Sequence, residues 1–461
     1  MYFAQHYLDC LSHASYLVGD TTTGQAVVVD PRRDISEYLA DAQEHGLSIV
    51  GVINTHFHAD FLAGHLELAA ATGAWIGYGQ VAEKLAEYEI RPLHDGERIE
   101  LGDVVLQIME TPGHTPESIS VLVFEHADDE VAYGVLTGDA LFIGDVGRPD
   151  LLASIGVTAD ELGKQLYDSI QHKLMGLPDA VRVFPAHGAG SACGKNLSTE
   201  RQSTIGEQRA FNYACQPMGE AEFVAIVTEG QPSAPAYFLF DAIQNRKAHE
   251  VYAEDQTAPV LDRAAYEAAV ADGAIVVDAR DPQDFAAGHM IGAINVPEDG
   301  RFAETVGMVV KPDDKVVIIA PAGREAEVAV RLARIGFDQV VGVVPEIEAW
   351  LAATPERSTS ASRLTAVQLA ELLEGDDAPV VLDVRNPGEL VNGTIPGSLH
   401  IPLAQLSARI DEVPTSTLVI HCAGGWRSSV AASYLRAQGR TDISDLLGGF
   451  SAWAAMKEPV A

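Results

Sequence analysis

The stretch INTHFHADF, residues 53–61, decides the fold of the first part of this 461-residue chain. It ends an apolar run and places His56, His58 and Asp60 at alternate positions. Imidazole and carboxylate groups are ligands that zinc and iron take in proteins. Metal-binding hydrolases with this pattern usually carry a further histidine after the aspartate, where this chain has Phe61. We therefore expect a metal site that lacks one ligand of a full two-metal set.

Three other apolar, strand-like runs in the N-terminal half are also followed by candidate ligands. The runs VVLQIM, VAYGVL and VRVF precede His114, Asp139 and His187, as SIVGVI precedes His56. If these strands end at one edge of a sheet sandwich, their loops bring the candidate ligands together. Scattered loop histidines are the plainer interpretation, but this number of His and Asp residues at strand ends favours a metal centre.

The same residues allow two ligand sets for one ion. His56, His58 and His114 would form a three-histidine zinc site with water in the fourth position. His56, His114 and Asp139 would form the two-histidine, one-carboxylate face typical of non-heme Fe(II), with positions open for reactants. The spacing does not choose between these sets. We expect one ion per chain, because Phe61 cannot serve a second site.

Composition and charge limit the classes of function. Apolar residues make up 47% and charged residues 21% of the chain, as in folded globular proteins, and the length suggests about three domains. The formal charge of −36 argues against nucleic acid as a partner. No apolar run is long enough to cross a membrane, and no secretory signal is visible at the N-terminus. Four cysteines without paired spacing fit a reducing compartment, and we expect the cytoplasm.

The C-terminal half contains an internal repeat. IVVDARDPQDFAAGHMIGAINVP at 275–297 matches VVLDVRNPGELVNGTIPGSLHIP at 380–402. Each copy alternates Val/Ile-rich strands with amphipathic helical segments, as in parallel α/β sheets. A polar linker is expected at 353–362. The predicted domains are 1–245, 257–355 and 363–461.

In the last copy, VIHCAGGWRSS at 419–429 places Cys422 at the end of an apolar strand, before a glycine-rich loop and a helix. The loop N–H groups, the helix N-terminus and Arg427 all favour the thiolate, so we expect Cys422 to be a nucleophile. An inert buried cysteine is the plainer interpretation, but such a cysteine rarely occupies a turn of this kind. The residues expected to bind substrate beside it are Gly424, Gly425 and Trp426.

The middle copy lacks this nucleophile. Its loop reads IIAPAGREAE, with Ala320 or Pro321 where the cysteine should be, and it reads one residue shorter. Glu325 and Glu327 follow it directly. We therefore expect residues 257–355 to be non-catalytic and to act as a spacer or an oligomer contact. A drifted duplicate with no role beyond packing is the alternative.

Residues 1 to about 215 resemble the metallo-β-lactamase superfamily, and its persulfide dioxygenase branch in particular. The stretches that carry the resemblance are LSHASYLVGD, THFHADF, TPGHTPES, LTGDALFIGDVGRPDL and FPAHG. The resemblance implies an αββα sandwich that oxidises a low-molecular-weight thiol persulfide, such as glutathione persulfide, with O2 to sulfite and thiol. It implies Fe(II) rather than zinc, which has no redox chemistry. The implied iron ligands are His56, His114 and Asp139, and the residues implied around them are His58, Asp60 and His187.

Two basic residues are candidates for substrate binding. Arg148 lies in GDVGRPD, and the resemblance implies that an arginine in this stretch contacts the substrate carboxylate. Lys195 in SACGKNLSTERQ adds positive charge nearby in the sequence. A surface salt bridge is the plainer interpretation of Arg148.

The two repeats resemble rhodanese (sulfurtransferase) domains. VLDVRNPGEL, GTIPGSLHIP and the six-residue loop from Cys422 to Arg427 carry this resemblance. Ala423 stands where many family members have an arginine, which disfavours thiosulfate as the donor.

The complete resemblance implies an α/β multidomain enzyme of sulfide detoxification, an αββα sandwich followed by two rhodanese-like domains with parallel sheets. Sulfite that accepts the sulfur on Cys422 would give thiosulfate. The expected partners are a small-molecule thiol persulfide, O2 and sulfite or thiosulfate, with no nucleic acid and no membrane, and we expect a homo-oligomer. The alternative is a zinc-dependent hydroxyacyl-thioester hydrolase of the glyoxalase II type.

Overall fold

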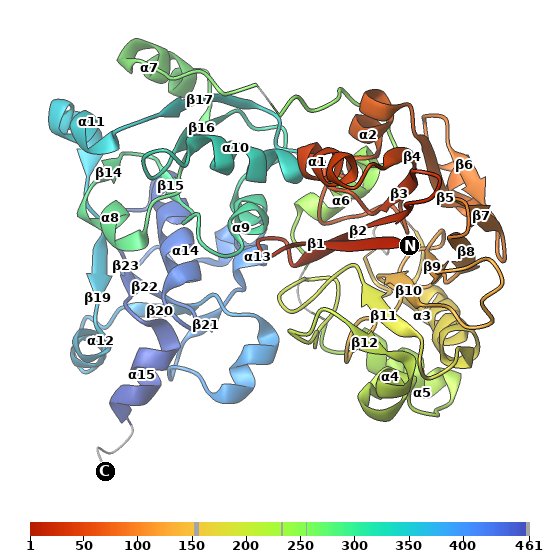
Figure 1. Ribbon diagram of the computed structural model, residues 1–461. Helices are drawn as coiled ribbons and strands as arrows, with labels where there is room; N and C mark the ends of the chain where they lie inside the picture. Colours follow the sequence, from red (N-terminus) through yellow and green to blue (C-terminus); the bar gives the residue numbers. More distant parts are fainter. Residues whose placement is uncertain (152–155, 232–233, 255, 458–461) are drawn as a thin grey trace. The chain divides into compact units, whose positions relative to one another are not determined.

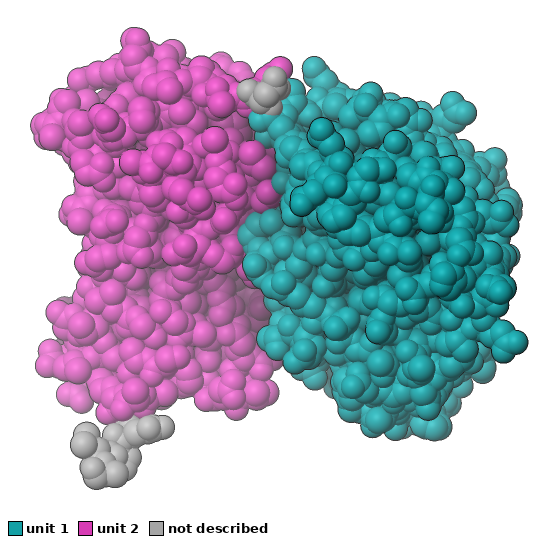
Figure 2. All heavy atoms as spheres, viewed as in Figure 1, with its two compact units in different colours: residues 1–234, 238–254 teal, residues 235–237, 255–461 magenta. Residues whose placement is uncertain are grey.

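The computed structural model describes residues 1–151, 156–231, 234–254 and 256–457 (Figure 1). Two compact units divide the chain (Figure 2). One unit consists of residues 1–234 and 238–254, and the other of residues 235–237 and 255–461. Short 3-10 turns lie at Gln80–Lys84, Leu174–Gly176, Tyr213–Cys215, Pro355–Arg357, Pro387–Asn392 and Ile410–Glu412, and a π-helical turn lies at Ser169–Lys173.

In its described residues the first unit contains two six-stranded sheets. The first sheet consists, in spatial order, of β1 (Tyr2–Leu8), β2 (His13–Asp20), β3 (Gln25–Val29), β4 (Ser48–Ile53), β5 (Trp75–Gly79) and β6 (Arg91–Leu93). The second consists, in spatial order, of β12 (Ser203–Thr204), β11 (Arg182–Pro185), β10 (Gly134–Gly138), β9 (Ile119–Phe124), β8 (Val105–Glu110) and β7 (Arg98–Glu100). The helices are α1 (Ser36–Glu44), α2 (His65–Thr72), α3 (Ala159–Asp168), α4 (Ile205–Phe211), α5 (Glu220–Thr228) and α6 (Tyr237–Gln244), of which α6 has its first residue in the second unit.

The sheets pack face to face, with helices on both outer sides. In β3, Val27 and Val29 join a buried cluster that contains residues of both sheets, whereas Ala26 and Val28 pack beside Tyr38 of α1. Successive side chains of a strand point to opposite faces, so both faces of this sheet are covered. The second sheet likewise has an outer cluster that includes residues of α3 and α5. The expected αββα sandwich is confirmed.

The strands predicted to precede the candidate ligands are all present. SIVGVI forms β4, and the other three runs contribute to β8, β10 and β11. Because β4 belongs to one sheet and the other three strands to the second, the candidate ligands come from both halves of the sandwich.

The second unit contains both repeat copies, each with a parallel sheet. The middle copy orders its sheet as β15 (Ile294–Asn295), β13 (Ile275–Asp278), β16 (Val316–Ile319) and β17 (Val340–Val344). The last copy orders its sheet as β19 (Ser362–Leu364), β23 (Ile443–Leu446), β22 (Leu418–His421), β20 (Val380–Asp383) and β21 (Leu399–His400). The helices are α7 (Arg263–Ala271), α8 (Pro282–Ala287), α9 (Phe302–Val309), α10 (Glu325–Arg334), α11 (Ile347–Ala353), α12 (Ala366–Leu373), α13 (Leu403–Leu406), α14 (Trp426–Ala437) and α15 (Gly449–Lys457).

Two details of the repeats differ from the expectation. The predicted linker at 353–362 contains a strand, β18 (Ser358–Thr359), which pairs with β14 (His289–Met290) of the middle copy. The loop of the middle copy is also not shorter than the Cys422 loop at the point where it leaves its strand. Strand pairing puts Ile319 at the place of His421, so Ala320 takes the place of the cysteine.

The copies contact each other through β15 and α14. Asn295 of the middle copy is fully buried, and its backbone N–H donates to Ser433 Oγ at 2.9 Å. Ser429 Oγ donates to Asn295 Oδ1 at 2.8 Å. The middle copy therefore supports the helix that follows the Cys422 loop.

Candidate metal centre and cysteine loop

The predicted ligands of the first unit lie on four loops that follow strands. The first three residues follow β4, and the others follow β8, β10 and β11: His56, His58, Asp60, His114, Asp139 and His187. Each of these side chains belongs to a residue that is at most 5% exposed. Buried carboxylates and imidazoles need compensating partners, because desolvation penalises their charged forms.

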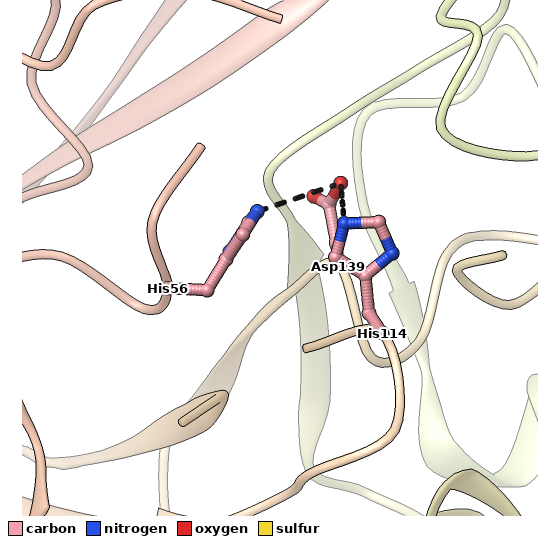
Figure 3. A group of neighbouring side chains, drawn as sticks. All are labelled: His56, His114 and Asp139. Carbon is pink, nitrogen blue, oxygen red and sulfur yellow. Dashed lines mark ion pairs between the residues drawn. The ribbon is translucent and has the colours of Figure 1, made fainter. Parts of the chain in front are cut away.

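Three of these residues form a close group (Figure 3). His56 Nε2 lies 3.9 Å and His114 Nε2 lies 3.5 Å from Asp139 Oδ2. The side chains of His56 and His114 both point toward the Asp139 carboxylate, with one ligand atom of each residue within 4.8 Å of the others. This is the two-histidine, one-carboxylate set predicted from the sequence.

The other three predicted residues form a second group beside the first. His58, Asp60 and His187 have ligand atoms within 4.8 Å of one another, and His187 Nε2 lies 3.3 Å from Asp60 Oδ2. Among the described residues, His58 therefore belongs with Asp60 and His187 and not with His56 and His114. Of the two predicted ligand sets, His56, His114 and Asp139 is the one whose ligand atoms form such a close group in the described residues.

Hydrogen bonds to the protein orient the imidazole rings. His114 Nδ1 donates to the carbonyl oxygen of Arg148 at 2.9 Å, which leaves the Nε2 lone pair for the centre. His187 Nδ1 donates in the same way to the carbonyl oxygen of Ser12 at 3.2 Å. His58 Nε2 lies 3.0 Å from Asp30 Oδ1. Metal-binding histidines typically use their second nitrogen in this way.

The buried atoms of the first group fit a divalent cation. Within the described parts of the chain, His56 Nε2 and both carboxylate oxygens of Asp139 have no hydrogen-bond partner. Their mutual contacts, at 3.5 to 3.9 Å, are too long for hydrogen bonds. Burial, with further contributions from His58 and His114, holds the pKa of His56 well below its usual value. A neutral imidazole and an uncompensated carboxylate are what a metal ion requires.

Phe61, which stands in the sequence where a further histidine was expected, lies beside the second group. It is fully buried, and its ring centroid lies 4.4 Å from that of His58 and 4.2 Å from that of His13. The second group therefore has an apolar ring beside it. His13 was not singled out from the sequence, although it lies 5.5 Å from the ring of His187. Only the pairing of β2 with the loop of β11 could have revealed its position.

Asn245 is a second residue that the sequence did not reveal. It follows α6, is fully buried and makes three hydrogen bonds to the loop that carries the ligands. Its Nδ2 donates to the carbonyl oxygens of His58 and Phe61, each at 2.8 Å. Its Oδ1 accepts from the backbone N–H of Ala63 at 2.9 Å. Asn245 is separated from this loop by more than 180 residues of sequence, so no local pattern signals the contact.

Cys193 forms a third close group with Asp139 and His187. The sequence left the role of this cysteine open. Burial, reinforced by the Asp60 and Asp139 carboxylates, holds the pKa of the Cys193 thiol well above its usual value. Its sulfur therefore borders the candidate centre as a soft, neutral group.

The two basic candidates are engaged with the protein. Arg148 is buried and donates from Nε and Nη2 to the Asp150 carboxylate, both at 2.7 Å. Lys195 Nζ donates to the carbonyl oxygens of Ile226 and Glu229 at the end of α5. Gly147 explains the close approach of this segment, because a Cβ there would lie 1.9 Å from the carbonyl oxygen of Asp139.

In the last copy, Cys422 follows β22 and is buried. The backbone N–H of Gly425 donates to its Sγ at 3.2 Å. Gly425 has φ +97°, a conformation that favours glycine and lets the loop turn toward the sulfur. Trp426 begins α14, so the helix N-terminus lies directly behind the loop, whereas Gly424 is exposed. A donor on sulfur and a helix N-terminus both stabilise a thiolate.

Arg427 is held by a residue that was not predicted. Its Nη1 and Nη2 donate to the two carboxylate oxygens of Glu389, both at 2.7 Å. Burial opposes its charge, but Glu389 and the nearby Cys422 raise the pKa of Arg427 above its ordinary value. Arg427 is therefore a fixed cation beside the thiol.

Comparisons with known proteins agree with this division of the chain. The family "Metallo-beta-lactamase superfamily" matches residues 8–187, and "Rhodanese-like domain" matches residues 262–353 and 365–456. The Bos taurus protein "Persulfide dioxygenase ETHE1, mitochondrial" is 32% identical over 200 residues, which cover 43% of this chain and 69% of that protein. "Hydroxyacylglutathione hydrolase" of Rhodospirillum rubrum is 31% identical over 238 residues, which cover 50% of this chain and 80% of that protein.

A solved structure is similar over a larger part of the chain. The crystal structure of a metallo-beta-lactamase from Staphylococcus aureus subsp. aureus COL has a TM-score of 0.67 and 33% identity. The similarity covers 75% of this chain and 99% of that one, so it extends beyond the first unit.

The chain is therefore an enzyme of the metallo-β-lactamase superfamily. The particular form is a domain related to persulfide dioxygenases joined to two rhodanese-like domains, and the predicted fusion, with its sulfurtransferase domain, is confirmed. Throughout the described residues, no helix is both long enough and apolar enough to cross a membrane.

Proposed function

We propose that the protein is a non-heme Fe(II) persulfide dioxygenase coupled to a sulfurtransferase. The observation that carries this proposal is the grouping of His56, His114 and Asp139 beside a second group that is bordered by the apolar ring of Phe61. Bound by these three residues, Fe(II) would supply redox chemistry and open positions for O2 and the terminal sulfur of a persulfide. A thiol persulfide, O2 and one water would give the thiol and sulfite. In that balance the terminal sulfur is oxidised and O2 is reduced.

The surrounding residues would hold the ligands and reactants in place. The bond from His114 Nδ1 to the carbonyl oxygen of Arg148 fixes the ring that carries the ligand nitrogen. His58, Asp60 and His187 would orient bound water or substrate, since their ligand atoms face the same space. Arg148 would act through its ion pair with Asp150 and its carbonyl oxygen, and Lys195 would contribute long-range positive charge only.

The last copy would carry sulfur on Cys422. Arg427 and the N–H of Gly425 would stabilise the thiolate and the persulfide anion that replaces it. Sulfite made in the first unit would accept this sulfur to give thiosulfate, or Cys422 would pass sulfur to a thiol for oxidation. We propose a role in sulfide detoxification. We propose glutathione persulfide or a similar persulfide as substrate, domains at 1–245, 257–355 and 363–461, a homo-oligomer, and the cytoplasm as the compartment.

A zinc-dependent thioester hydrolase is the second candidate. The observation that favours it is the 31% identity to the hydroxyacylglutathione hydrolase of Rhodospirillum rubrum over 80% of that protein. Phe61 argues against this candidate, because a second zinc would have His58, Asp60 and His187 as its ligands and an apolar ring beside them. Zinc also gives no role to the attached rhodanese-like domains.

Metal analysis combined with two assays separates the candidates. The full chain is purified without oxygen, and its iron and zinc contents are measured. O2 consumption with glutathione persulfide is then compared with hydrolysis of lactoylglutathione. We expect one iron per chain and O2 consumption. Stoichiometric zinc with thioester hydrolysis and no O2 consumption would establish the second candidate instead.

A ligand variant tests the assignment of the first group. Asp139→Ala is expected to abolish iron loading, because it removes the carboxylate shared by both histidine contacts. Asp168→Ala, which removes an exposed carboxylate of α3 that pairs only with His172 in the described residues, is the matched control and should retain iron. Full iron content in Asp139→Ala would contradict the ligand set.

A further inference from the structure

The middle copy contains a cavity of about 290 Å³ that is separate from the loop at 320–324, since none of the described residues of that loop lines it. Its walls are formed by α7, by the end of β14 with the residue after it, and by the segment from α11 to the turn at Pro355–Arg357. Pockets for small organic ligands range from about 300 to 1,000 Å³, so this cavity suits a ligand at the small end of that range.

One wall of the cavity depends on the strand pair within the predicted linker. Met290 of β14 pairs with Ser358 of β18. The backbone N–H of Ile291 donates to the carbonyl oxygen of Arg357 at 2.9 Å, which extends the pairing by one bond. Ile291 and Arg357 both line the cavity, so the strand pair fixes the backbone of this wall.

Aromatic and aliphatic side chains give the cavity an apolar surface. Tyr266 of α7 is 6% exposed and packs in the core of the copy with Met290. The ring of Trp350 stands edge-on to the ring of Tyr266, with centroids 5.6 Å apart and planes at 72°. Ile291 lines the same space and is 59% exposed. Such a surface suits a flat apolar body that packs against ring faces.

The polar groups without a partner in the cavity are hydrogen-bond donors. In the part of the chain that the structure describes, neither the Tyr266 hydroxyl nor the Arg357 guanidinium has a hydrogen-bond or ion-pair partner. The hydroxyl oxygen is not enclosed by protein, so it is open to the cavity. Burial raises the pKa of Tyr266 to about 12 although the Arg357 charge opposes the rise, so the phenol keeps its proton at neutral pH. A guanidinium has donors and no acceptor, and a protonated phenol can donate beside it.

The acidic groups of the cavity are already engaged. Arg263 donates from Nε to Glu267 at 3.1 Å and from Nη2 to Glu356 at 2.9 Å. The charge without an ion-pair partner among the described lining residues is therefore that of Arg357. A ligand with one negative charge matches this guanidinium, whereas a dianion would bring a second charge close to the two glutamates.

We propose that the middle copy binds a small monocarboxylate with a flat apolar body in this cavity. The carboxylate accepts hydrogen bonds from the Tyr266 hydroxyl and the Arg357 guanidinium, and the apolar body lies against Trp350. The site is independent of the proposed sulfur chemistry, because it contains neither a cysteine nor a candidate metal ligand. It gives the middle copy a binding role that is additional to the predicted role as a spacer.

A binding experiment with the full chain tests the proposal. Cinnamate is the probe, and cinnamamide is its neutral counterpart of nearly the same shape. Ligand-observed NMR titrations measure both dissociation constants. We expect a dissociation constant of about 1 mM for cinnamate and binding of cinnamamide that is weaker by about 5-fold or more. Equal binding of the two compounds would overturn the carboxylate site, and so would the absence of saturable cinnamate binding.

Three variants locate the site. Tyr266→Phe removes only the hydroxyl and should weaken cinnamate binding by about 5-fold or more. Arg357→Gln removes the exposed cation and should weaken it by about 3-fold. Ile291→Trp fills the cavity from an exposed position and should abolish the binding of both compounds.

Val367→Trp on α12 is the matched control for the filling variant, because Val367 is 54% exposed and lies outside this cavity. It should bind cinnamate as the wild type does. Thermal unfolding midpoints show which variants are folded, and the two variants at exposed positions decide the test if Tyr266→Phe is unstable. Cinnamate binding by Ile291→Trp that equals binding by Val367→Trp would overturn the proposal.

Hydrogen exchange gives a readout that needs no variant. Because the strand pair forms one wall, saturating cinnamate should slow exchange in residues 286–292 and 355–361 by about 2-fold or more. Exchange in α12 should stay unchanged. Protection of the last copy without protection of these two segments would place the ligand elsewhere and overturn the proposal.

Discussion

The two rhodanese-like copies share a framework and differ in the loop that it supports. In the middle copy, Arg280 Nη2 donates to Asp278 Oδ2 at 2.6 Å and to the carbonyl oxygen of Gly288 at 2.9 Å. In the last copy, Arg385 Nη2 makes the same two bonds to Asp383 and Gly393 at the same distances. Both ion pairs are buried and fix the segment that follows the first strand of the copy.

The loops above these ion pairs are different. Ala320 takes the place of Cys422, and Glu325 begins α10 where Trp426 and the cation Arg427 begin α14. Gly323 nevertheless has φ +80°, close to the +97° of Gly425, so the turn itself survives. The comparison teaches that the chemistry depends on a few side chains at the strand end, while the fold depends on the ion pair and the sheet.

The largest effect is expected from removing the nucleophile. Cys422→Ser should abolish sulfur transfer, because no other cysteine occupies a strand-to-helix loop in the described chain. O2 consumption with supplied persulfide should stay unchanged, since the candidate metal centre is formed entirely by residues of the first unit. Thiocyanate formation and O2 uptake measure the two activities. Loss of both activities would contradict separate sites.

The next largest effect should come from breaking the ion pair of the last copy. Asp383→Asn leaves Arg385 buried without its carboxylate, which costs about 3–5 kcal/mol of unfolding free energy. Asp278→Asn should lower the free energy of unfolding by less than Asp383→Asn does. Burial raises the pKa of Asp278 despite Arg280, whereas the pKa of Asp383 is lowered by Arg385 and His421 despite burial. Urea unfolding measures the free energy lost in each variant, and hydrogen exchange of β13 and β20 shows which copy is destabilised. Equal losses in the two variants would contradict the expected difference between the copies.

A smaller, pH-dependent effect should distinguish the middle copy. Burial lowers the pKa of His289 to about 4, and the last copy has Thr394 at this position. Between pH 6.5 and about 4, His289 is protonated in the unfolded state but stays neutral in the folded state. The free energy of unfolding therefore falls as the pH falls, by about 1–3 kcal/mol. His289→Thr should flatten this dependence. Unfolding midpoints of wild type and variant over this pH range test it, and parallel curves would disprove the role of His289.

The smallest effect should come from restoring only the cysteine of the middle copy. Ala320→Cys in a Cys422→Ser background should give no sulfur transfer, because the first turn of α10 carries the acidic Glu325 and a nearby carboxylate disfavours the thiolate. The double variant Ala320→Cys, Glu325→Arg is the companion. Sulfur transfer by Ala320→Cys in the Cys422→Ser background would show that the charges around the cysteine are less important than the comparison of the two copies suggests.

Much of the fold could be predicted because its signals are local. The apolar runs before His56 and Asp139 form β4 and β10, and the repeat of the second half gives two matching parallel sheets. The ligand residues were also visible, because each follows a strand. The sequence did not show which of their ligand atoms lie close together, since that depends on how loops from two different sheets approach each other.

Other contacts had no local signal. Glu389 holds Arg427 across the sheet of the last copy, and its role depends on the pairing of β20 with β22. The predicted shortening of the middle loop was wrong, because the strand register puts Ala320 at the place of Cys422 and α10 then begins no sooner after it than α14 does after Cys422. The strand within the predicted linker forms because β14 offers an edge to Ser358–Thr359, which no sequence period reveals.

The hydrogen bonds of Asn245 have a practical consequence for dissecting this protein. A fragment ending at residue 187, where the superfamily match ends, would keep the six predicted ligand residues and lose the side chain that holds the His58 and Phe61 carbonyl oxygens. Such a fragment would expose a polar backbone that is now satisfied, and its ligand loop would be free to move. A recombinant first unit intended for metal titration should therefore extend to residue 254.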